Sequence, residues 1–276
     1  MFYENIPVIS VNKPFQTYYK NAEIPRYLDN FMRTGLNTEE RSEFESLLKD
    51  FMMLAKENNL TFMISDGSLL GAYRHHGMIP WDDDFDIMFP KLQRGKILEL
   101  FKGKYRNSNL SLWSSNIVDM QWKIFRAGKP FIGESTKWSY PFIDMFHYSE
   151  FKGIIRCKQF QFKSADIFPL AKVPFMGSWL PAPGKWGKYL NIVYGKNLMT
   201  KCSNLWYLHR IEKHNSDELV TVSCENLQRF VPFVSRSCSS TGVITETLKI
   251  GNKRLHVWSY TAGIDGAPVD SCTLYP

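Results

Sequence analysis

The sequence predicts an α/β (α+β) protein in which helices flank a mixed β-sheet. Three observations support this fold class. Residues 38–58 place apolar side chains on one helix face, residues 60–146 alternate short apolar strands with helical stretches, and residues 218–260 contain segments rich in β-branched and aromatic side chains. A chain of 276 residues is long enough for one large domain or two small ones.

The first predicted element is a helix over residues 38–58. Phe44, Leu48 and Phe51 belong to a row of apolar residues at the spacing of one buried helix face. Asn37 and Glu40 stand three residues apart, which is the spacing of a capping pair at a helix start.

From residue 60 onward, strands and helices alternate along the chain. The pattern predicts a buried strand over residues 60–65, a turn at Asp66-Gly67-Ser68, a short helix over residues 68–76 and a second strand over residues 84–89. Later elements are a helix over 91–102, strands over 121–127 and 141–146, helices over 184–195 and 203–214, and β-segments over 218–260.

Four aspartates, Asp82, Asp83, Asp84 and Asp86, crowd into five positions beside an apolar strand. Side chains alternate along a strand, so Asp84 and Asp86 point to one face and Phe85 to the other. Carboxylates this close repel each other. A hard divalent cation such as Mg²⁺ or Mn²⁺ would offset the repulsion and still leave room for substrate phosphates.

Asp144 is the best candidate for a third carboxylate, because it stands among apolar residues that predict a neighbouring buried strand. An unpaired buried charge is costly, so this side chain needs a partner. A cation shared with Asp84 and Asp86 would supply one. The alternative is a strand-end aspartate that accepts hydrogen bonds from the backbone.

Gly67 and Ser68 open the short helix, and the N–H groups at such a start favour a phosphate. Arg74 on the same helix is either a phosphate contact or an ordinary surface arginine. His75 and His76 are candidate metal ligands or general bases, with a pair of loop histidines as the alternative. Phosphates at the first turn and carboxylates on the next strand are the layout of a nucleotidyltransferase.

The segment DGSLLGAYRHHGMIPWDDDFDI (66–87) closely resembles the signature of the LicD/fukutin/fukutin-related protein family of phosphotransferases. Looser similarity continues in SYPFIDMFHY (139–148), DIFPL (166–170) and KYLNIVYG (188–195). The chain shows no cysteine cluster like the zinc-binding insert of fukutin-related protein, and residues 201–276 match no family landmark.

This resemblance implies a nucleotidyltransferase-like fold and a metal-dependent transfer reaction. A phosphorylated alcohol, such as phosphocholine or ribitol phosphate, would move from a CDP-linked donor to a hydroxyl of a glycan, glycolipid or glycoprotein, with release of CMP. By position, Asp84, Asp86 and Asp144 would be catalytic and would hold Mg²⁺ or Mn²⁺. The predicted donor-binding residues are Gly67, Ser68, Asp66, Arg74 and Asp83. The acceptor hydroxyl would lose its proton to Asp144 or to Asp83.

Two other functions are alternatives. A glycosyltransferase with an Asp-x-Asp motif would use a nucleotide-sugar, but such folds place a longer nucleotide-binding half before the motif. A catalytically inactive family member would only bind a glycan, although all three expected carboxylates are present. A calcium-binding EF-hand is excluded, because Ile87 stands where the loop needs glycine and Gln93 where it needs glutamate.

The predicted organisation is an N-terminal arm over residues 1–36, a catalytic domain over 37–200 and a C-terminal accessory region over 201–276. Residues 151–200 account for the net charge of +7, because this segment contains eight basic residues and a single acidic residue, Asp166. Such a stretch suits an anionic substrate, with a solvated face as the alternative. No nucleic-acid partner is expected, because the basic residues form no dense run or known motif.

Location is predicted from the cysteines and from the family. Four of the five cysteines lie in the last 75 residues, which suits one or two disulfides in an oxidising compartment, or else buried thiols in a reducing one. An animal member would work in the lumen of the Golgi or endoplasmic reticulum, and a bacterial member in the cytoplasm. The cysteines favour the former. Membrane association would depend on an N-terminal anchor that this chain lacks.

Overall fold

The structure is a computed structural model, and it describes residues 28, 31, 34–115, 121–205, 207–215 and 219–272. Most of the predicted arm over residues 1–36 lies outside the described residues. The division into arm, catalytic domain and accessory region stays a prediction.

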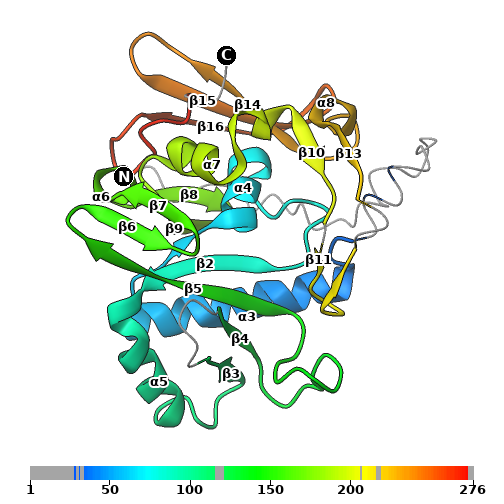
Figure 1. Cartoon of the computed structure of the whole chain (residues 1–276). Coiled ribbons are helices and arrows are strands. Elements are labelled where there is room, and N and C mark those ends of the chain that lie inside the picture. The colour runs from blue at the N-terminus through cyan, green and yellow to red at the C-terminus, as the bar shows by residue number, and fades with distance from the viewer. Residues whose placement is uncertain are drawn as a thin grey trace.

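A seven-stranded mixed sheet forms the centre of the described structure (Figure 1). Its path runs through β1 (Met63–Ile64), β2 (Phe85–Pro90), β5 (Phe142–Phe151), β4 (Trp122–Arg126) and β3 (Leu110–Trp113), and β5 also pairs with the hairpin β6 (Ile154–Cys157) and β7 (Phe160–Lys163). β2 and β5 run parallel, whereas the other neighbouring strands run antiparallel. The predicted mixed sheet with flanking helices is confirmed.

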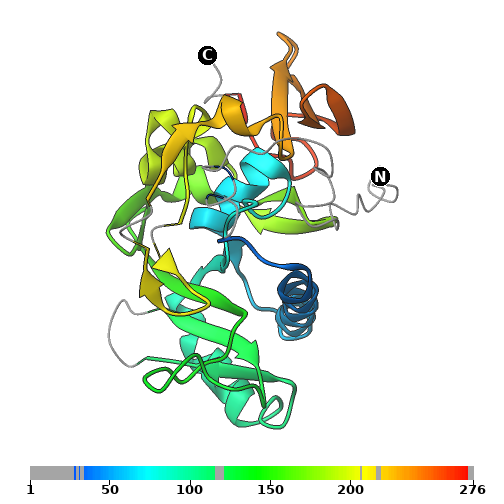
Figure 2. The same cartoon turned by 90° about the vertical axis from the view of Figure 1, so that its right-hand side faces the viewer.

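Helix α3 (Thr38–Glu57) lies along one face of this sheet (Figures 1 and 2). The predicted capping pair is present, because the Asn37 side chain accepts from Glu40 N at 2.9 Å and Asn37 N donates to Glu40 Oε2 at 2.9 Å. The apolar face packs on the sheet, with the Phe44 and Phe85 ring centres 5.4 Å apart. Helix and cap were predictable because both depend on residues close in sequence.

Helix α4 (Asp66–His75) joins β1 to β2 and begins earlier than the sequence predicts. The predicted turn at residues 66–68 is wrong, because these residues form the first turn of α4. β2 holds that turn in place: Asp86 N donates to Ser68 Oγ at 2.8 Å, and Gly67 N donates to Asp86 Oδ2 at 3.1 Å. The strand predicted over residues 60–65 shortens to the two residues of β1.

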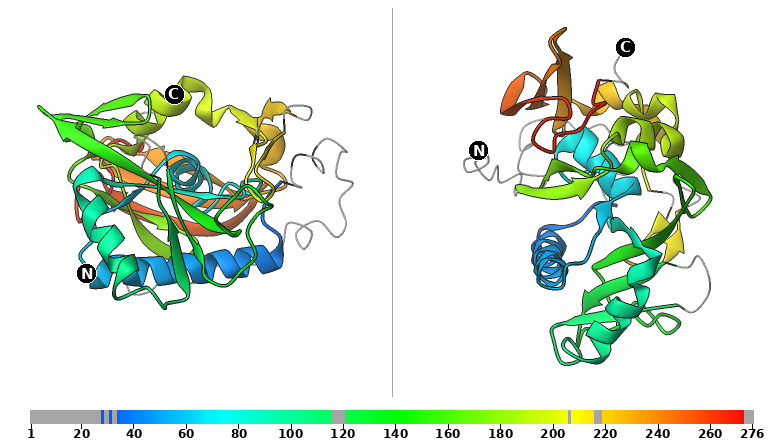
Figure 3. Two further views of the ribbon diagram at one scale, coloured as in Figure 1. Left: turned by 60° about the horizontal axis from the view of Figure 1, so that its bottom comes forward. Right: turned by 90° about the vertical axis from the view of Figure 1, so that its left-hand side faces the viewer.

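The remaining elements surround this centre. They are η1 (Lys91–Gln93), α5 (Arg94–Lys102), α6 (Ser164–Ile167), β8 (Ala171–Phe175), β9 (Ser178–Ala182), α7 (Trp186–Tyr194), η2 (Lys196–Met199), β10 (Lys201–Ser203), β11 (Tyr207–Leu208), β12 (Lys213–His214), β13 (Thr221–Ser223), α8 (Cys224–Leu227), β14 (Phe233–Cys238), β15 (Val243–Ile250) and β16 (Lys253–Thr261). The three-stranded sheet β14–β15–β16 lies at the opposite end of the molecule from α5 (Figures 1 and 3).

The helix predicted over residues 203–214 is wrong, because β11 and β12 form a short antiparallel hairpin there. The turn of this hairpin is held by a residue far away in the sequence. Asp83 accepts hydrogen bonds from the His209 ring at 2.8 Å and from Arg210 N at 3.2 Å. Contacts with a residue so far away in sequence override a weak local helical pattern.

A buried polar network attaches the sheet β14–β16 to α4. Glu246 is fully buried and accepts from His76 Nε2 and from Arg236 Nε, each at 2.6 Å. His75 is also buried, with Nδ1 2.6 Å from the carbonyl oxygen of Pro232. Both histidines thus have structural partners. His75 is the last residue of α4, so the loop alternative is wrong for it, whereas His76 follows the helix as its C-cap.

Two disulfides, Cys202–Cys224 and Cys238–Cys272, lie in the C-terminal part, and the buried Cys157 belongs to neither. The sequence predicts either one or two disulfides or buried thiols for these cysteines, and the structure contains disulfides. The first disulfide ties β10 to the start of α8.

Replacing Cys202 and Cys224 together with serine is expected to lower the free energy of unfolding by about 2–4 kcal/mol, because the crosslink restricts the unfolded chain. Urea denaturation of the oxidised protein measures this loss. The single change Cys157→Ser is the matched control, since it removes a buried thiol without breaking a crosslink. Equal stability of the double variant and the wild type would contradict the prediction.

Candidate active site

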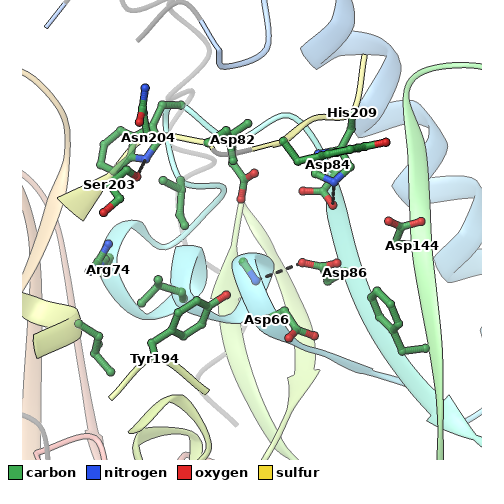
Figure 4. A pocket seen from close by; sticks show the side chains of 18 of the residues that line it. Asp66, Arg74, Asp82, Asp84, Asp86, Asp144, Tyr194, Ser203, Asn204 and His209 are labelled. Atoms are coloured by element: carbon green, nitrogen blue, oxygen red, sulfur yellow. Dashed lines mark hydrogen bonds and ion pairs between the residues drawn. The ribbon is translucent and has the colours of Figure 1, made fainter. Parts of the chain in front are cut away.

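Strand register brings the predicted carboxylates together. Asp86 on β2 stands directly beside Asp144 on the parallel strand β5, and Asp84 lies one residue before β2. One oxygen from each of the three carboxylates lies within 4.8 Å of the others (Figure 4). All three side chains are buried, and the group can hold a metal ion.

These carboxylates line a cavity of about 630 Å³. Its wall is formed by α4, β2 and β5 on one side and by residues from α7 to the β11–β12 turn on the other (Figure 4). The second wall includes Tyr194, Asn197, Lys201, Ser203, Asn204, Tyr207 and His209. Two hydrogen bonds join the walls: Arg74 Nη2 donates to Lys201 O at 3.0 Å, and Trp81 Nε1 donates to Ser203 O at 2.8 Å.

Burial sets the charge state of the carboxylates. It raises the pKa of Asp86 well above its usual value, and the negative charges of Asp84 and Asp66 raise it further. The pKa of Asp82 is also well above its usual value, again through burial and then through Asp84. A cation would relieve this repulsion, and a cluster of carboxylate oxygens suits a hard divalent ion.

Gly67 provides room for this crowding. A Cβ at this position would lie 2.8 Å from Asp82 Oδ2 and 3.4 Å from Asp86 Oδ2. The Gly67 N–H and the Ser68 hydroxyl are already hydrogen-bonded to Asp86. Their predicted role as a cradle for the donor phosphates stays a prediction.

Two lysines flank the carboxylates, and sequence reasoning missed both. Lys123 on β4 stands opposite Asp144 in the sheet, and its Nζ lies 2.6 Å from Asp144 Oδ1. Lys158, at the β6–β7 turn, places Nζ 3.1 Å from Asp66 Oδ2 and 3.2 Å from the centre of the Phe146 ring. The available signal for Lys123 was a lysine within the apolar strand QWKIFRA, where a buried cation requires an anionic partner.

The other predicted donor-site residues fall into two groups. Asp66 and Arg74 line the cavity. Asp83 is buried away from it, with Oδ1 2.8 Å from His209 Nδ1 and Oδ2 3.2 Å from Arg210 N. His209, also missed from the sequence, places its other ring nitrogen, Nε2, 3.3 Å from Asp84 Oδ2.

The charge of His209 follows from these neighbours. Burial alone would lower its pKa, but the negative charges of Asp84 and Asp83 raise the pKa to about 10. In the absence of a cation, the imidazolium therefore offsets part of the negative charge at this end of the cavity.

Comparison with known proteins shows that part of this site lies in a segment similar to a known family. Residues 59–185 match the family model described as LicD/FKTN/FKRP, nucleotidyltransferase domain. Two uncharacterized proteins, from Rickettsia prowazekii and Rickettsia typhi, are each 54% identical over 41 residues, which is 15% of this chain and 15% and 13% of the relatives. The lipopolysaccharide cholinephosphotransferase LicD of Haemophilus influenzae is 40% identical over 42 residues, which is 15% of this chain and 16% of that protein. These alignments span only a small part of each relative's length.

Residues 59–185 carry a LicD/FKTN/FKRP-type domain, which confirms the resemblance seen in the sequence. Among the described residues, every helix is too short or too polar to cross a membrane.

Proposed function

We propose that this protein is a metal-dependent transferase that moves a phosphorylated alcohol from a CDP-linked donor to a glycan hydroxyl and releases CMP. The observation that carries this proposal is the convergence of Asp84, Asp86 and Asp144 in a cavity within the LicD-type segment. The resemblance to a cholinephosphotransferase supports phosphocholine as one donor group to test.

The proposed reaction gives each of the following side chains a role. Asp84, Asp86 and Asp144 would hold Mg²⁺ or Mn²⁺, which supplies charge neutralisation at the donor diphosphate when bound. Lys158 lines the same cavity and would contact a donor phosphate oxygen. Of the two predicted proton acceptors, Asp144 lines the cavity and Asp83 does not, so we assign the acceptor proton to Asp144.

The test is CMP release from CDP-choline and CDP-ribitol, each with Mg²⁺ or Mn²⁺. CMP formation by the wild type, and none by the Asp84→Asn/Asp86→Asn variant, is the expected result. Asp265→Asn is the matched control, because this aspartate is exposed and does not line the cavity. CMP release that is unaffected by loss of both aspartates would overturn the proposal.

Lys158→Met is expected to raise the KM for the donor about 10- to 100-fold, because one charge-assisted hydrogen bond to a phosphate contributes about 1.5–3 kcal/mol. Burial alone would lower the pKa of Lys158, but the charges of Asp66 and Asp86 raise it, so the ammonium group stays charged. Steady-state kinetics measure the change. Lys163→Met removes an exposed lysine from the adjacent strand β7 and is the control. An unchanged KM in the Lys158 variant would contradict this role.

A further inference from the structure

The imidazole of His209 lies at the edge of the carboxylate group, and we propose that its Nε2 atom is a direct ligand of the bound cation, next to Asp84. This inference rests on the cation site of the proposed function. It adds a nitrogen donor from outside residues 59–185, the segment that matches the family.

The first argument is the distance between the two donor atoms. His209 Nε2 lies 3.3 Å from Asp84 Oδ2. Neighbouring ligands that each lie about 2.0–2.1 Å from one ion are about 2.9–3.4 Å apart in octahedral or tetrahedral geometry. The two atoms are therefore already spaced as ligands of one ion, which would take the place of the Nε2 proton of the imidazolium and release that proton to solvent.

The second argument is the orientation of the ring. Nδ1 lies 2.8 Å from Asp83 Oδ1, so an N–H there donates to a carboxylate that is itself buried. Asp83 Oδ2 accepts from Arg210 N, so both of its oxygens are engaged. A carboxylate that binds the far nitrogen of a histidine is the usual support for a metal-binding imidazole, because it fixes both tautomer and direction.

Aromatic packing further restrains the imidazole. The ring centre of His209 lies 6.0 Å from that of Phe142 and 5.1 Å from that of Tyr207, both with steeply inclined planes. The side chain is only 19% exposed. The imidazole is thus restrained by two aromatic neighbours, unlike a histidine on an open surface.

The arrangement has a consequence for metal choice. Asp84 belongs to two groups of candidate ligands, one with Asp86 and Asp144 and one with Asp83 and His209. Because both oxygens of Asp83 are engaged, His209 is the donor that the second group adds. Imidazole nitrogen binds transition metals better than it binds Mg²⁺. The wild type should therefore prefer Mn²⁺ to Mg²⁺, and loss of His209 should reduce that preference.

The test uses the full-length protein, freed of metal and loaded with Mn²⁺. Electron spin-echo envelope modulation detects nitrogen bonded directly to Mn²⁺. We expect a ¹⁴N coupling in the wild type that changes to a ¹⁵N coupling after labelling with ¹⁵N-histidine. The His209→Asn variant, whose side chain can still contact Asp83, should lose this coupling and bind Mn²⁺ about 10- to 100-fold more weakly. His214→Gln, an exposed histidine in the same hairpin, is the matched control and should keep the coupling.

Each outcome is decisive. Bound Mn²⁺ without nitrogen coupling in the wild type overturns the inference but leaves the proposed carboxylate site standing. A coupling that persists in folded His209→Asn, as judged by circular dichroism, also overturns it. Failure of the wild type to bind Mn²⁺ overturns both the inference and the metal-dependent function. If His209→Asn does not fold, the isotope-dependent coupling of the wild type still decides whether a histidine is a ligand.

Discussion

Asp86→Asn is expected to slow CMP release sharply and, at the same time, to raise the melting temperature of the metal-free protein. Loss of a cation ligand should slow the reaction about a thousandfold, because charge neutralisation by the metal is worth several kcal/mol. The stability gain follows from the environment of Asp86, where burial and neighbouring carboxylates disfavour the ionised form. Asparagine retains the shape and can still accept from Gly67 N, but it carries no charge.

The same pKa shifts predict how stability varies with pH. The pKa of Asp82 and of Asp86 is higher in the folded protein than the usual 3.8, so the folded state binds more protons than the unfolded state above that pH. Stability of the metal-free protein should therefore fall as the pH rises from 3.8 through the folded-state pKa values. Saturating Mn²⁺ should flatten this dependence.

Thermal melts in EDTA at about pH 5 and about pH 8 measure both effects. Asp166→Asn is the control, because the pKa of Asp166 is shifted in the opposite direction from that of Asp86. Asp166 accepts from Lys185 at 2.5 Å, and its pKa is lowered. That variant should show no gain in melting temperature. A metal-free Asp86→Asn protein that melts below the wild type at about pH 8 would contradict the account of charge repulsion.

Lys123→Met is expected to destabilise the metal-free protein by about 3–5 kcal/mol, because it leaves the buried Asp144 carboxylate without its charged partner. Lys123 is 2% exposed and lies within 2.6 Å of that carboxylate. A bound cation would replace part of the lost charge, so Mn²⁺ should recover part of the stability. Such a recovery of stability by Mn²⁺ distinguishes a lysine at a cation site from a lysine that only fills the core.

Urea denaturation with and without Mn²⁺ measures the loss and its recovery. Lys137→Met, an exposed lysine in the β4–β5 connection, is the matched control and should change stability little. A loss that is the same with and without Mn²⁺ would show that Lys123 and the cation do not share Asp144.

The sequence was informative where the relevant contacts are local. The cap of α3 and the alternation of Asp84, Phe85 and Asp86 depend on neighbouring residues, and the structure confirms the cap and keeps Asp84 and Asp86 in one group. Lys123 was missed because its role depends on the register between β4 and β5, which local periodicity does not define.

The hairpin that carries His209 was missed for a related reason. Its position depends on Asp83, which lies 126 residues earlier in the chain. A single sequence contains no local pattern that reports such a pairing, so residues 203–214 resembled a helix. The candidate site was therefore predictable on the β2 side of the cavity and not on the opposite side.

The parallel pairing of β2 with β5 also constrains the order of assembly during folding. β3, β4 and β5 are consecutive antiparallel neighbours, so they can pair early through short loop closures. β2 must instead dock beside β5 across all of those intervening elements, and such non-local pairing is slow. Asp86 and Asp144 meet only at that step. The binding pocket should therefore be among the last parts of the sheet to form, and cation capture should report completion of folding rather than guide its beginning.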